Sequence, residues 1–352
     1  MTTKVMLLGG TGAMGVYLVA ELRKIGVKVY VTSRRTWPST GDVRYLEGNA
    51  HDMRFVRQCV KEIHPDAIVD FMIYSTDEFR ARVTELTAFS DQYVYLSSYR
   101  VLADEMPVSE RTPRLLDVTT DPVFLATDIY PLAKARQENE LIDKSAGNWT
   151  IVRPGITYSK ERFQFGCLEA NTVCFRSFRN VPVVIPSVML DKTTVMTWGG
   201  DVAKMISRLI LNSSCYNEVF LTASSETHTW REIYCYYRDL IGMSLVETPT
   251  LDEYERIIGS HYHYQMLFDR MFNRRIDNTK ILRATGLQQA EFMPLRKGLE
   301  KELAYFRDHE YYGFMNIPEN ARMDAYCHSS IDLSHFSPEE VKQYKEAYDG
   351  SK

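Results

Sequence analysis

The stretch KVMLLGGTGAMG, residues 4–15, decides the fold of this chain. Its first five residues form an apolar run typical of a buried strand, glycines follow at positions 9, 12 and 15, and residues 14–22 have a helical composition. Glycines let the backbone approach a phosphate, and a helix N-terminus offers unpaired N–H groups and a favourable dipole to the same anion. Three glycines at this spacing can also make an ordinary turn. Because they join a strand to a helix here, we interpret residues 4–22 as a dinucleotide-binding unit.

The composition limits the class of protein. The chain has 352 residues, of which 45% are hydrophobic, which suits one large α/β domain or one with a smaller appendage. A net charge of −4 argues against a broad basic surface for nucleic acid. The six cysteines form no C-x-x-C pair, which argues against a zinc site and a disulfide framework, and no apolar run is long enough to span a bilayer. We therefore expect a soluble cytoplasmic protein without a metal or a membrane partner.

Strand-like and helical segments alternate along the chain up to Pro154. Apolar and β-branched runs predict strands, and the stretches between them have the composition and period of helices. The mostly apolar run at 67–73 is typical of a central strand that is buried on both faces. This alternation predicts an α/β fold with a doubly wound parallel sheet of the Rossmann type, which binds ligands at the carboxyl ends of its strands. The expected strands are residues 4–8, 27–32, 43–46, 67–73, 93–96 and 149–154, and the expected helices include 77–90 and the one that opens at Ile129.

Beyond Gly155 the alternation gives way to mostly helical sequence. After Gly242 the chain is rich in Tyr, Met and Arg, a composition that suits a lid or a substrate-binding region. We expect residues 1–160 to form the Rossmann domain, completed by about 190–225. Residues 161–190 and 226–310 would form a smaller, mostly helical substrate domain, and residues 311–352 a C-terminal extension.

The second expected strand ends in Ser33-Arg34-Arg35. In a dinucleotide fold this strand end contacts the adenosine ribose, where an acidic residue favours NAD and a cation favours the 2′-phosphate of NADP. The acidic residue is absent, so we predict a preference for NADP, with NAD possible, through Arg34 and with Arg35 stacking on or clamping the phosphate. A solvated basic loop is the alternative. Asp52 is expected to cap the helix that begins at Met53 and to reach the adenine.

Tyr130 and Lys134 lie four residues apart on a predicted helix and therefore share one face. Ser97 and Ser98 stand at the carboxyl end of the fifth expected strand. A phenol with a pKa of ~10 is a poor base at neutral pH, but a neighbouring ammonium and an oxidised nicotinamide both favour the phenolate. A tyrosine can then exchange a proton with a substrate hydroxyl while hydride passes between its carbon and the nicotinamide. The pattern predicts a hydride-transfer centre, although such pairs also occur on surface helices.

With these motifs in place, the chain resembles the short-chain dehydrogenase/reductase superfamily, in its extended NAD(P)-dependent epimerase/dehydratase branch. The resemblance covers residues 3–308 and rests on residues 9–15, 96–101, 130–134 with Glu138, 152–158, 200–203 and 277–287. It implies that Ser98, Tyr130 and Lys134 are the catalytic residues, that Ser97 supports the strand end, and that the substrate is a nucleotide-activated sugar. The cofactor contacts that it implies come from Gly9, Gly12, Ala13, Met14, Gly15, Ser33, Arg34, Arg35, Asp52, Met72, Tyr130, Lys134 and Pro154.

Two departures from that family bear on the chemistry. The 4,6-dehydratases of this branch carry an Asp-Glu pair after the catalytic hydroxyl residue, where this chain has Tyr99 and Arg100. Dehydration is therefore disfavoured, which leaves epimerisation through a keto intermediate or a net oxidation or reduction. The strand at 67–73 ends in Phe-Met-Ile-Tyr, where the family has a small Asn-Ala-Gly-like stretch, so we expect a differently built cofactor floor.

Two functions from different classes remain open. One is an NAD(P)-dependent oxidoreductase or epimerase of a nucleotide-activated sugar, and the other is a non-catalytic RNA-binding or NADP-sensing protein on the same scaffold. The presence of all three catalytic side chains favours the enzyme, because a pure binding protein has no need of them. The resemblance also implies a homodimer that pairs residues 77–90 and 130–144. One of two arginine clusters is expected to contact the diphosphate of the substrate, either Arg270, Arg274 and Arg275 or Arg176 and Arg179. The alternative is that these arginines lie on a solvated helix face.

Overall fold

The structure is a computed structural model that describes residues 2–351. Contacts between Cα atoms divide the chain into two compact units, each assembled from separate segments. The first unit comprises Met1–Thr157, Met196–Ser225 and Ile276–Met293, and the second comprises Tyr158–Val195, Glu226–Arg275 and Pro294–Lys352. Residues 276–293, which the sequence led us to place in the substrate region, therefore group with the first unit.

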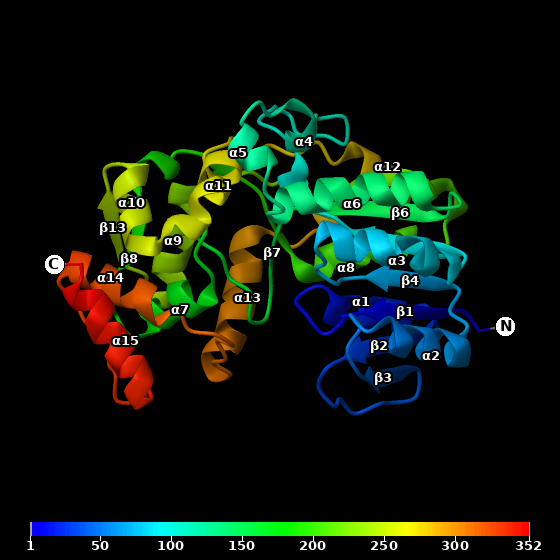
Figure 1. Cartoon of the computed structure of the whole chain (residues 1–352), viewed down its shortest axis with the longest axis horizontal. Helices are drawn as coiled ribbons and strands as arrows, with labels where there is room; N and C mark the ends of the chain where they lie inside the picture. The colour runs from blue at the N-terminus through cyan, green and yellow to red at the C-terminus, as the bar shows by residue number, and fades with distance from the viewer. Residues whose placement is uncertain (1, 352) are drawn as a thin grey trace. The chain divides into compact units, whose positions relative to one another are not determined.

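A seven-stranded parallel sheet forms the centre of the first unit (Figure 1). The strand order is β11-β6-β5-β4-β1-β2-β3, so the chain starts near the middle, winds out to one edge, returns, and winds out to the other. The predicted doubly wound Rossmann sheet is confirmed. The strands are β1 (Lys4–Leu8), β2 (Lys28–Ser33), β3 (Val43–Glu47), β4 (Ala67–Asp70), β5 (Gln92–Leu96), β6 (Trp149–Pro154) and β11 (Glu218–Thr222).

Two hydrophobic cores lie on opposite faces of this sheet. Successive residues of a strand point to opposite sides, and accordingly Val5 and Leu7 of β1 join one core while Met6 and Leu8 join the other. A fully buried side chain of this kind stabilises the fold by about 1.5–3 kcal/mol, so each layer of helices is held by several such contacts. The first core contains residues of α1 (Gly15–Lys24), α8 (Gly199–Leu209) and α12 (Thr279–Thr285), and the second contains residues of α2 (Met53–Ile63), α3 (Thr76–Ala88) and α6 (Tyr130–Lys144).

The fourth strand is shorter than the sequence predicted. It ends at Asp70 instead of Ile73, because the Asp70 carboxylate accepts a hydrogen bond from the Met72 N–H at 2.9 Å and the chain turns away from the sheet there. The stretch 101–129, which has no clear hydrophobic period, contains little regular structure. Its neighbourhood holds only the short elements η1 (Tyr99–Val101), α4 (Leu115–Val118) and α5 (Pro122–Leu125).

The second unit is mostly helical, as expected. Its longer helices are α7 (Ala170–Phe178), α9 (Trp230–Ile241), α10 (Leu251–Ile258), α13 (Leu295–Asp308), α14 (Ile317–Cys327) and α15 (Pro338–Asp349). Two small sheets accompany them, β8 (Val183–Pro186) with β13 (Leu245–Thr248) and β9 (Thr193–Thr194) with β12 (His228–Thr229). The remaining short elements of the chain are β7 (Ile156–Tyr158), β10 (Met196–Trp198), α11 (His263–Gln265), η2 (Ser187–Met189), η3 (Ser213–Cys215), η4 (Ser260–Tyr262), η5 (Met266–Arg270) and η6 (Gln289–Glu291).

A buried ion pair ties the C-terminal helices into the second unit. Arg176 on α7 donates to Asp324 on α14 at 2.7 Å, and both side chains are fully buried. Tyr344 on α15 donates to the same carboxylate at 2.6 Å. Removing one partner of a buried pair costs about 3–5 kcal/mol because it strands the other charge. The helices α14 and α15, which lie in the segment predicted to be an extension, are therefore a packed part of this unit.

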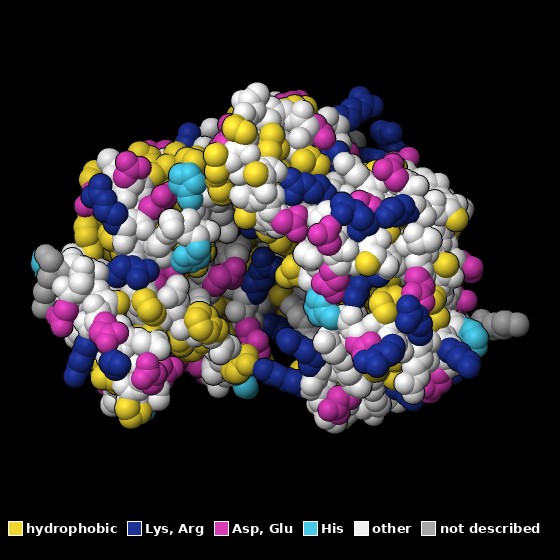
Figure 2. All heavy atoms as spheres, viewed as in Figure 1, with side chains coloured by type: hydrophobic (Ala, Val, Ile, Leu, Met, Phe, Trp, Pro, Cys, Tyr) yellow, Lys and Arg dark blue, Asp and Glu magenta, His cyan; other side chains and the backbone are white. Residues whose placement is uncertain are grey.

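The visible face is mixed in charge (Figure 2). Figure 2 shows acidic and basic side chains interspersed over the visible face. Within residues 2–351, no helix is both long enough and apolar enough to cross a membrane.

Candidate active site

Steric constraints shape the glycine turn between β1 and α1. Gly9 has a left-handed φ of +71°, and a Cβ there would lie 2.8 Å from the Met72 sulfur. A Cβ at Gly15 would lie 2.3 Å from the Gly10 carbonyl oxygen, so the first turn of α1 packs directly on the backbone of the turn. A Cβ at Gly12, by contrast, would meet nothing within 4 Å. The turn is thus held at both ends, while its middle leaves the backbone open to approach.

The N-terminus of α1 fits a pyrophosphate. Met14 is its N-cap and makes no side-chain capping bond, and the first turn, all within the described residues, carries no acidic residue. The positive end of the helix dipole is therefore not neutralised locally. The Gly9 N–H donates to the Thr32 hydroxyl at 2.9 Å, which fixes the turn to β2. The predicted phosphate contacts of Gly9, Gly12, Ala13, Met14 and Gly15 agree with this geometry and stay predictions.

The end of β2 presents two arginines to solvent. Ser33 is buried, and its hydroxyl accepts a hydrogen bond from the Arg35 N–H at 3.1 Å. The Arg34 and Arg35 side chains are exposed in the loop that follows. The preference for NADP stays a prediction.

Asp52 caps α2, as predicted. Its carboxylate accepts the Arg54 N–H at 2.9 Å and the Arg54 guanidinium at 3.1 Å, and these bonds hold the pKa of Asp52 below its usual value. Its contact with an adenine stays a prediction. Pro154, the other distant residue expected at the cofactor, is buried at the end of β6 and pairs with Thr222 of β11.

The three predicted catalytic residues come from two adjacent elements. Ser98 follows β5, and Tyr130 and Lys134 occupy the first two turns of α6. The Lys134 Nζ donates to the Leu96 carbonyl oxygen, the last of β5, at 2.7 Å. Arg100, which follows Ser98 in η1, lies over the Tyr130 ring with its Cζ 5.2 Å from the ring centroid. The carboxyl end of β5 and the start of α6 therefore lie side by side at the strand edge where the fold binds ligands.

Lys134 is a buried cation. Its side chain is 3% exposed, and its Nζ lies 4.6 Å from the centroid of the Tyr95 ring. Burial lowers the pKa of Lys134 to about 8, because water no longer stabilises the ammonium, while the charges of Asp70 and Glu138 oppose that shift. The ammonium can therefore gain and lose its proton close to neutral pH.

The segment after β4 is built on a buried carboxylate. Asp70 accepts hydrogen bonds from the hydroxyls of Tyr93 at 2.6 Å and Tyr74 at 3.0 Å. Burial raises the pKa of Asp70 despite these bonds. Met72 lies against Gly9 on one side, and its carbonyl oxygen is 3.5 Å from the Lys134 Nζ. Large side chains thus occupy a segment where the resemblance drawn from the sequence implies small ones.

Glu138, one turn beyond Lys134, was absent from the predicted site. It is buried and takes a bidentate pair of bonds from Arg153 at 2.8 and 2.7 Å, with a further bond from Arg114 at 3.3 Å. The Ser97 hydroxyl donates to the same carboxylate at 2.6 Å, which agrees with the role in strand support predicted for Ser97. The spacing of 130, 134 and 138 could have indicated this residue, because all three share one helical face.

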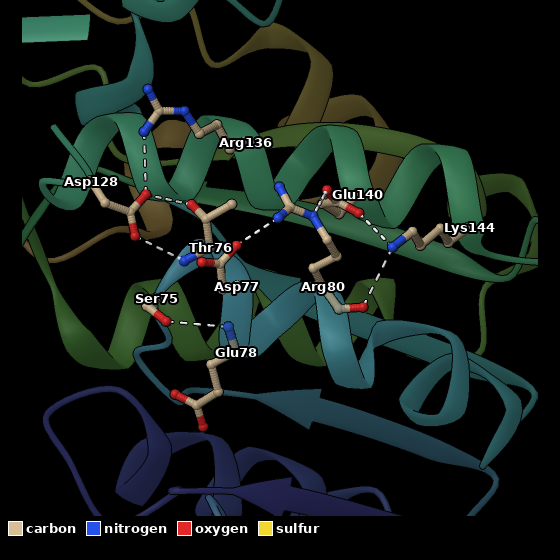
Figure 3. Close-up of polar contacts among 9 residues, drawn as sticks. All are labelled: Ser75, Thr76, Asp77, Glu78, Arg80, Asp128, Arg136, Glu140 and Lys144. Atoms are coloured by element: carbon tan, nitrogen blue, oxygen red, sulfur yellow. Dashed lines mark hydrogen bonds and ion pairs between the residues drawn. The ribbon is translucent and has the colours of Figure 1, made fainter. Parts of the chain in front are cut away.

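A separate network fixes the start of α6 (Figure 3). Asp128, two residues before Tyr130, accepts bonds from the Thr76 N–H at 2.9 Å and the Thr76 hydroxyl at 2.5 Å, where α3 begins. Arg136 donates to Asp128 at 3.2 Å and to the carbonyl oxygens of Thr127 and Leu125 at 2.6 Å each. The loop before Tyr130 is therefore anchored from both α3 and α6.

The arginines expected at a diphosphate differ in their surroundings within the second unit. Arg176 lies in the buried pair with Asp324, so the phosphate contact predicted for it is not retained. Arg270 is buried and donates to the Gly166 carbonyl oxygen at 2.7 Å, and Arg274 is buried as well. Arg275 is exposed. Among the described residues, no group of three or more His, Cys, Asp or Glu side chains is arranged to hold a metal ion.

Comparisons with known proteins agree with this fold. The NAD dependent epimerase/dehydratase family matches residues 5–87. No curated protein matches the sequence. Among solved structures, a putative epimerase from Burkholderia cenocepacia aligns with a TM-score of 0.65 and 18% identity over 87% of this chain and 98% of its own. MoeE5 in complex with UDP-glucuronic acid and NAD aligns with a TM-score of 0.67 and 17% identity over 87% of this chain and 99% of its own.

A dehydratase also has this fold. The dTDP-glucose 4,6-dehydratase from Bacillus anthracis, in complex with NAD, aligns with a TM-score of 0.67 and 13% identity over 88% of this chain and 98% of its own. The predicted resemblance is confirmed over residues 5–87, which match the NAD dependent epimerase/dehydratase family, and the chain shares the fold of these solved proteins.

The buried ammonium makes stability depend on pH. The pKa of Lys134 is about 8 in the folded protein, whereas that of an ordinary exposed lysine is 10.5. Between these values the unfolded state binds the proton that the folded state has released, so stability rises with pH. We expect the free energy of unfolding to gain about 2 kcal/mol from this residue between pH 7 and pH 9.5. Urea unfolding of the parent and of Lys134→Met at both pH values should show that gain only in the parent.

The exposed Lys61→Met variant is the matched control and should follow the parent. Parallel pH dependence in the parent and in Lys134→Met would show that the ammonium is not destabilised by burial.

Proposed function

We propose that this protein is an NADP-dependent oxidoreductase or epimerase that acts on a nucleotide-activated sugar. One observation carries the proposal: Lys134 is buried one helical turn after Tyr130, at the carboxyl edge of the parallel sheet. At the same edge, the glycine turn between β1 and α1 leaves its backbone open to a pyrophosphate. Neighbours in fold support the substrate class, since MoeE5 was solved with UDP-glucuronic acid and with UDP-glucose, and a Thermotoga maritima UDP-glucose 4-epimerase with UDP-glucose.

Tyr130 would exchange the proton in this reaction. As phenolate it takes the proton of a substrate hydroxyl, hydride leaves the same carbon, and a ketone forms. Bound NADP supplies the acceptor for that hydride and, in the reverse direction, its donor. The ammonium of Lys134 stabilises the phenolate charge, and the Ser98 hydroxyl shares the substrate oxygen. Return of the hydride to the opposite face of the ketone would give an epimer, and release of the ketone a net oxidation.

The residues after Ser98 favour redox chemistry over dehydration. Elimination of water needs an acid and a base at the carbons next to the ketone, and Tyr99 and Arg100 provide no carboxyl group. The buried carboxyl groups Asp70 and Glu138 already accept hydrogen bonds from tyrosines and arginines, respectively. The proposal therefore disfavours a 4,6-dehydratase of the usual kind.

A panel of nucleotide sugars tests the activity. Incubation with oxidised or reduced cofactor should give an isomer, detected by NMR, if the protein is an epimerase, or a product that differs by two hydrogens in mass if it is an oxidoreductase. Tyr130→Phe should lower turnover by at least about a hundredfold while the variant still binds the cofactor, because the substitution removes the proton carrier and leaves the rest of the cofactor site in place. A fully active Tyr130→Phe would contradict the mechanism, and cofactor binding without turnover of any sugar would favour an NADP sensor instead.

The cofactor preference tests the arginines after β2. We expect the parent to bind NADP(H) more tightly than NAD(H), because the exposed Arg34 guanidinium can pair with the 2′-phosphate. Arg34→Ala should weaken NADPH binding by about tenfold and leave NADH binding unchanged, as measured by calorimetry. Arg44→Ala, an exposed arginine on β3, is the control and should change neither affinity. Equal affinities for the two cofactors in the parent would show that it has no NADP preference.

We also propose a homodimer that pairs α3 and α6. The exposed residues Ala81, Thr84 and Ala88 have short side chains, so a second helix can approach α3 closely on this face. Ion pairs line the neighbouring edge, with Arg80 joined to Glu140 at 2.5 Å (Figure 3). Sedimentation should give the mass of two chains, and Thr84→Arg should give a monomer through steric and charge conflict. A single-chain mass for the parent would contradict this pairing.

A further inference from the structure

Asp70 is a buried carboxylate that the catalytic mechanism does not use. It ends β4, and its side chain is fully buried. It accepts hydrogen bonds from the Met72 N–H at 2.9 Å and from the hydroxyls of Tyr93 at 2.6 Å and Tyr74 at 3.0 Å. These donors reach both oxygens, which suits the ionised form, because a protonated acid must also donate a bond. All three donors are neutral, so the charge of Asp70 needs a counterion elsewhere.

The backbone of Met72 joins Asp70 to Lys134. Met72 directs its N–H to the Asp70 carboxylate, and its carbonyl oxygen lies 3.5 Å from the Lys134 Nζ. The other hydrogen bond of this ammonium goes to the Leu96 carbonyl oxygen at 2.7 Å. An N–H turned toward an anion and a C=O turned toward a cation favour both charges. The two buried charges are therefore separated by a single residue of backbone.

Glu138 is the second carboxylate whose charge favours the Lys134 ammonium. Its own charge is already shared by two cations, since Arg153 donates to it at 2.8 and 2.7 Å and Arg114 at 3.3 Å. Asp70, in contrast, bonds only neutral groups among the described residues. Of the two carboxylates, Asp70 is thus the one with an uncompensated charge.

The other titratable groups around this pair do not supply an anion. They are the phenols of Tyr74, Tyr93, Tyr95 and Tyr130. Arg82 on α3 lies 4.5 Å from the centroid of the Tyr74 ring and pairs with Glu78 at 3.0 Å. Arg100 in η1 lies over the Tyr130 ring, with 5.2 Å between its Cζ and the ring centroid. A second cation on this side of α6 increases the need of the ammonium for an anion.

We propose that Asp70 is the counterion of Lys134 and that it keeps the buried ammonium charged at neutral pH, acting across the backbone of Met72. The pKa of Lys134, about 8, leaves about nine-tenths of the molecules charged at pH 7. Loss of the Asp70 charge lowers the proton affinity of Lys134 by about tenfold, so that about half of them are neutral at that pH. Asp70 is thus a positioning residue that acts through Lys134. Its bearing on catalysis rests on the proposed function, in which the ammonium stabilises the Tyr130 phenolate.

The pH dependence of urea unfolding tests the counterion without any substrate. The four proteins are the parent, Asp70→Asn, Lys134→Met and the double variant. The stability difference between a protein and its Lys134→Met counterpart rises with pH once the folded lysine has lost a proton that the unfolded chain still binds. We expect this rise to begin at about pH 8 in the parent and about one pH unit lower with Asp70→Asn. The same onset in both overturns the proposal.

Two controls separate the charge of Asp70 from its hydrogen bonds. Asp91→Asn removes an exposed carboxylate and should keep the parent onset. Tyr74→Phe removes one hydrogen bond to Asp70 but leaves its charge, so the onset should again stay near that of the parent. A shift in Tyr74→Phe as large as that in Asp70→Asn overturns the proposal, because it assigns the effect to loosening of the segment after β4.

The reciprocal measurement does not require Asp70→Asn to fold. Lys134→Met leaves Asp70 without its counterion, so linkage requires Asp70 to take up its proton at a higher pH than in the parent. Below that pH the folded state holds a proton that the unfolded chain has released, and stability falls as pH rises. In Lys134→Met this fall should extend about one pH unit further than in the parent. Identical acid limbs overturn the proposal.

Turnover separates this inference from the proposed function. With any nucleotide sugar that the parent converts, Asp70→Asn should lose activity on the alkaline side about one pH unit earlier, because the mechanism needs the ammonium. An unchanged alkaline limit beside a shifted lysine titration contradicts the role of the ammonium in the proposed function and supports the counterion. Absence of turnover with every sugar contradicts the proposed function alone, since the unfolding curves decide the role of Asp70.

Discussion

The site depends on one buried carboxylate, Glu138. Its four hydrogen-bonded contacts bring together α6, the end of β5, the strand β6 and the residue before α4. Removing one partner of such a buried pair costs about 3–5 kcal/mol, because the remaining charge loses both water and its counterion. The bonds therefore set the position of α6 on the sheet. Since Tyr130 and Lys134 lie on the same helix, this cluster also sets where the proposed chemistry takes place.

A second group of polar side chains is buried around Lys134, which lies on the same helix as Tyr130. The Lys134 ammonium is buried against the ring of Tyr95. The Asp70 carboxylate is buried on the neighbouring strand, where it accepts hydrogen bonds from two tyrosine hydroxyls. Burial lowers the pKa of the lysine and raises that of the aspartic acid, so both charges are costly and each partly offsets the other. A lysine with a lowered pKa suits the role proposed for Lys134, because the tyrosine phenolate that it would stabilise forms and is protonated again within one turnover.

The two units use polar burial for different purposes. In the first unit, buried charges surround the residues proposed to react. In the second, the pair of Arg176 with Asp324 joins α7 to α14, and Tyr344 adds α15, so this cluster serves packing. An arginine in the sequence therefore indicates either phosphate binding or core packing, and only its partners distinguish the two.

The sequence alone determined those features that depend on neighbouring residues. The glycine turn, the alternation of strands and helices, the cap at Asp52 and the shared face of Tyr130 and Lys134 all follow from local periodicity and local hydrogen bonding. Tertiary structure decided which distant groups meet. The early end of β4 required the Asp70 carboxylate to be buried, the partners of Glu138 came from segments far apart in the chain, and residues 276–293 joined the first unit. These outcomes depend on which side chains the folded sheet brings within a few ångströms, and no local pattern encodes that choice.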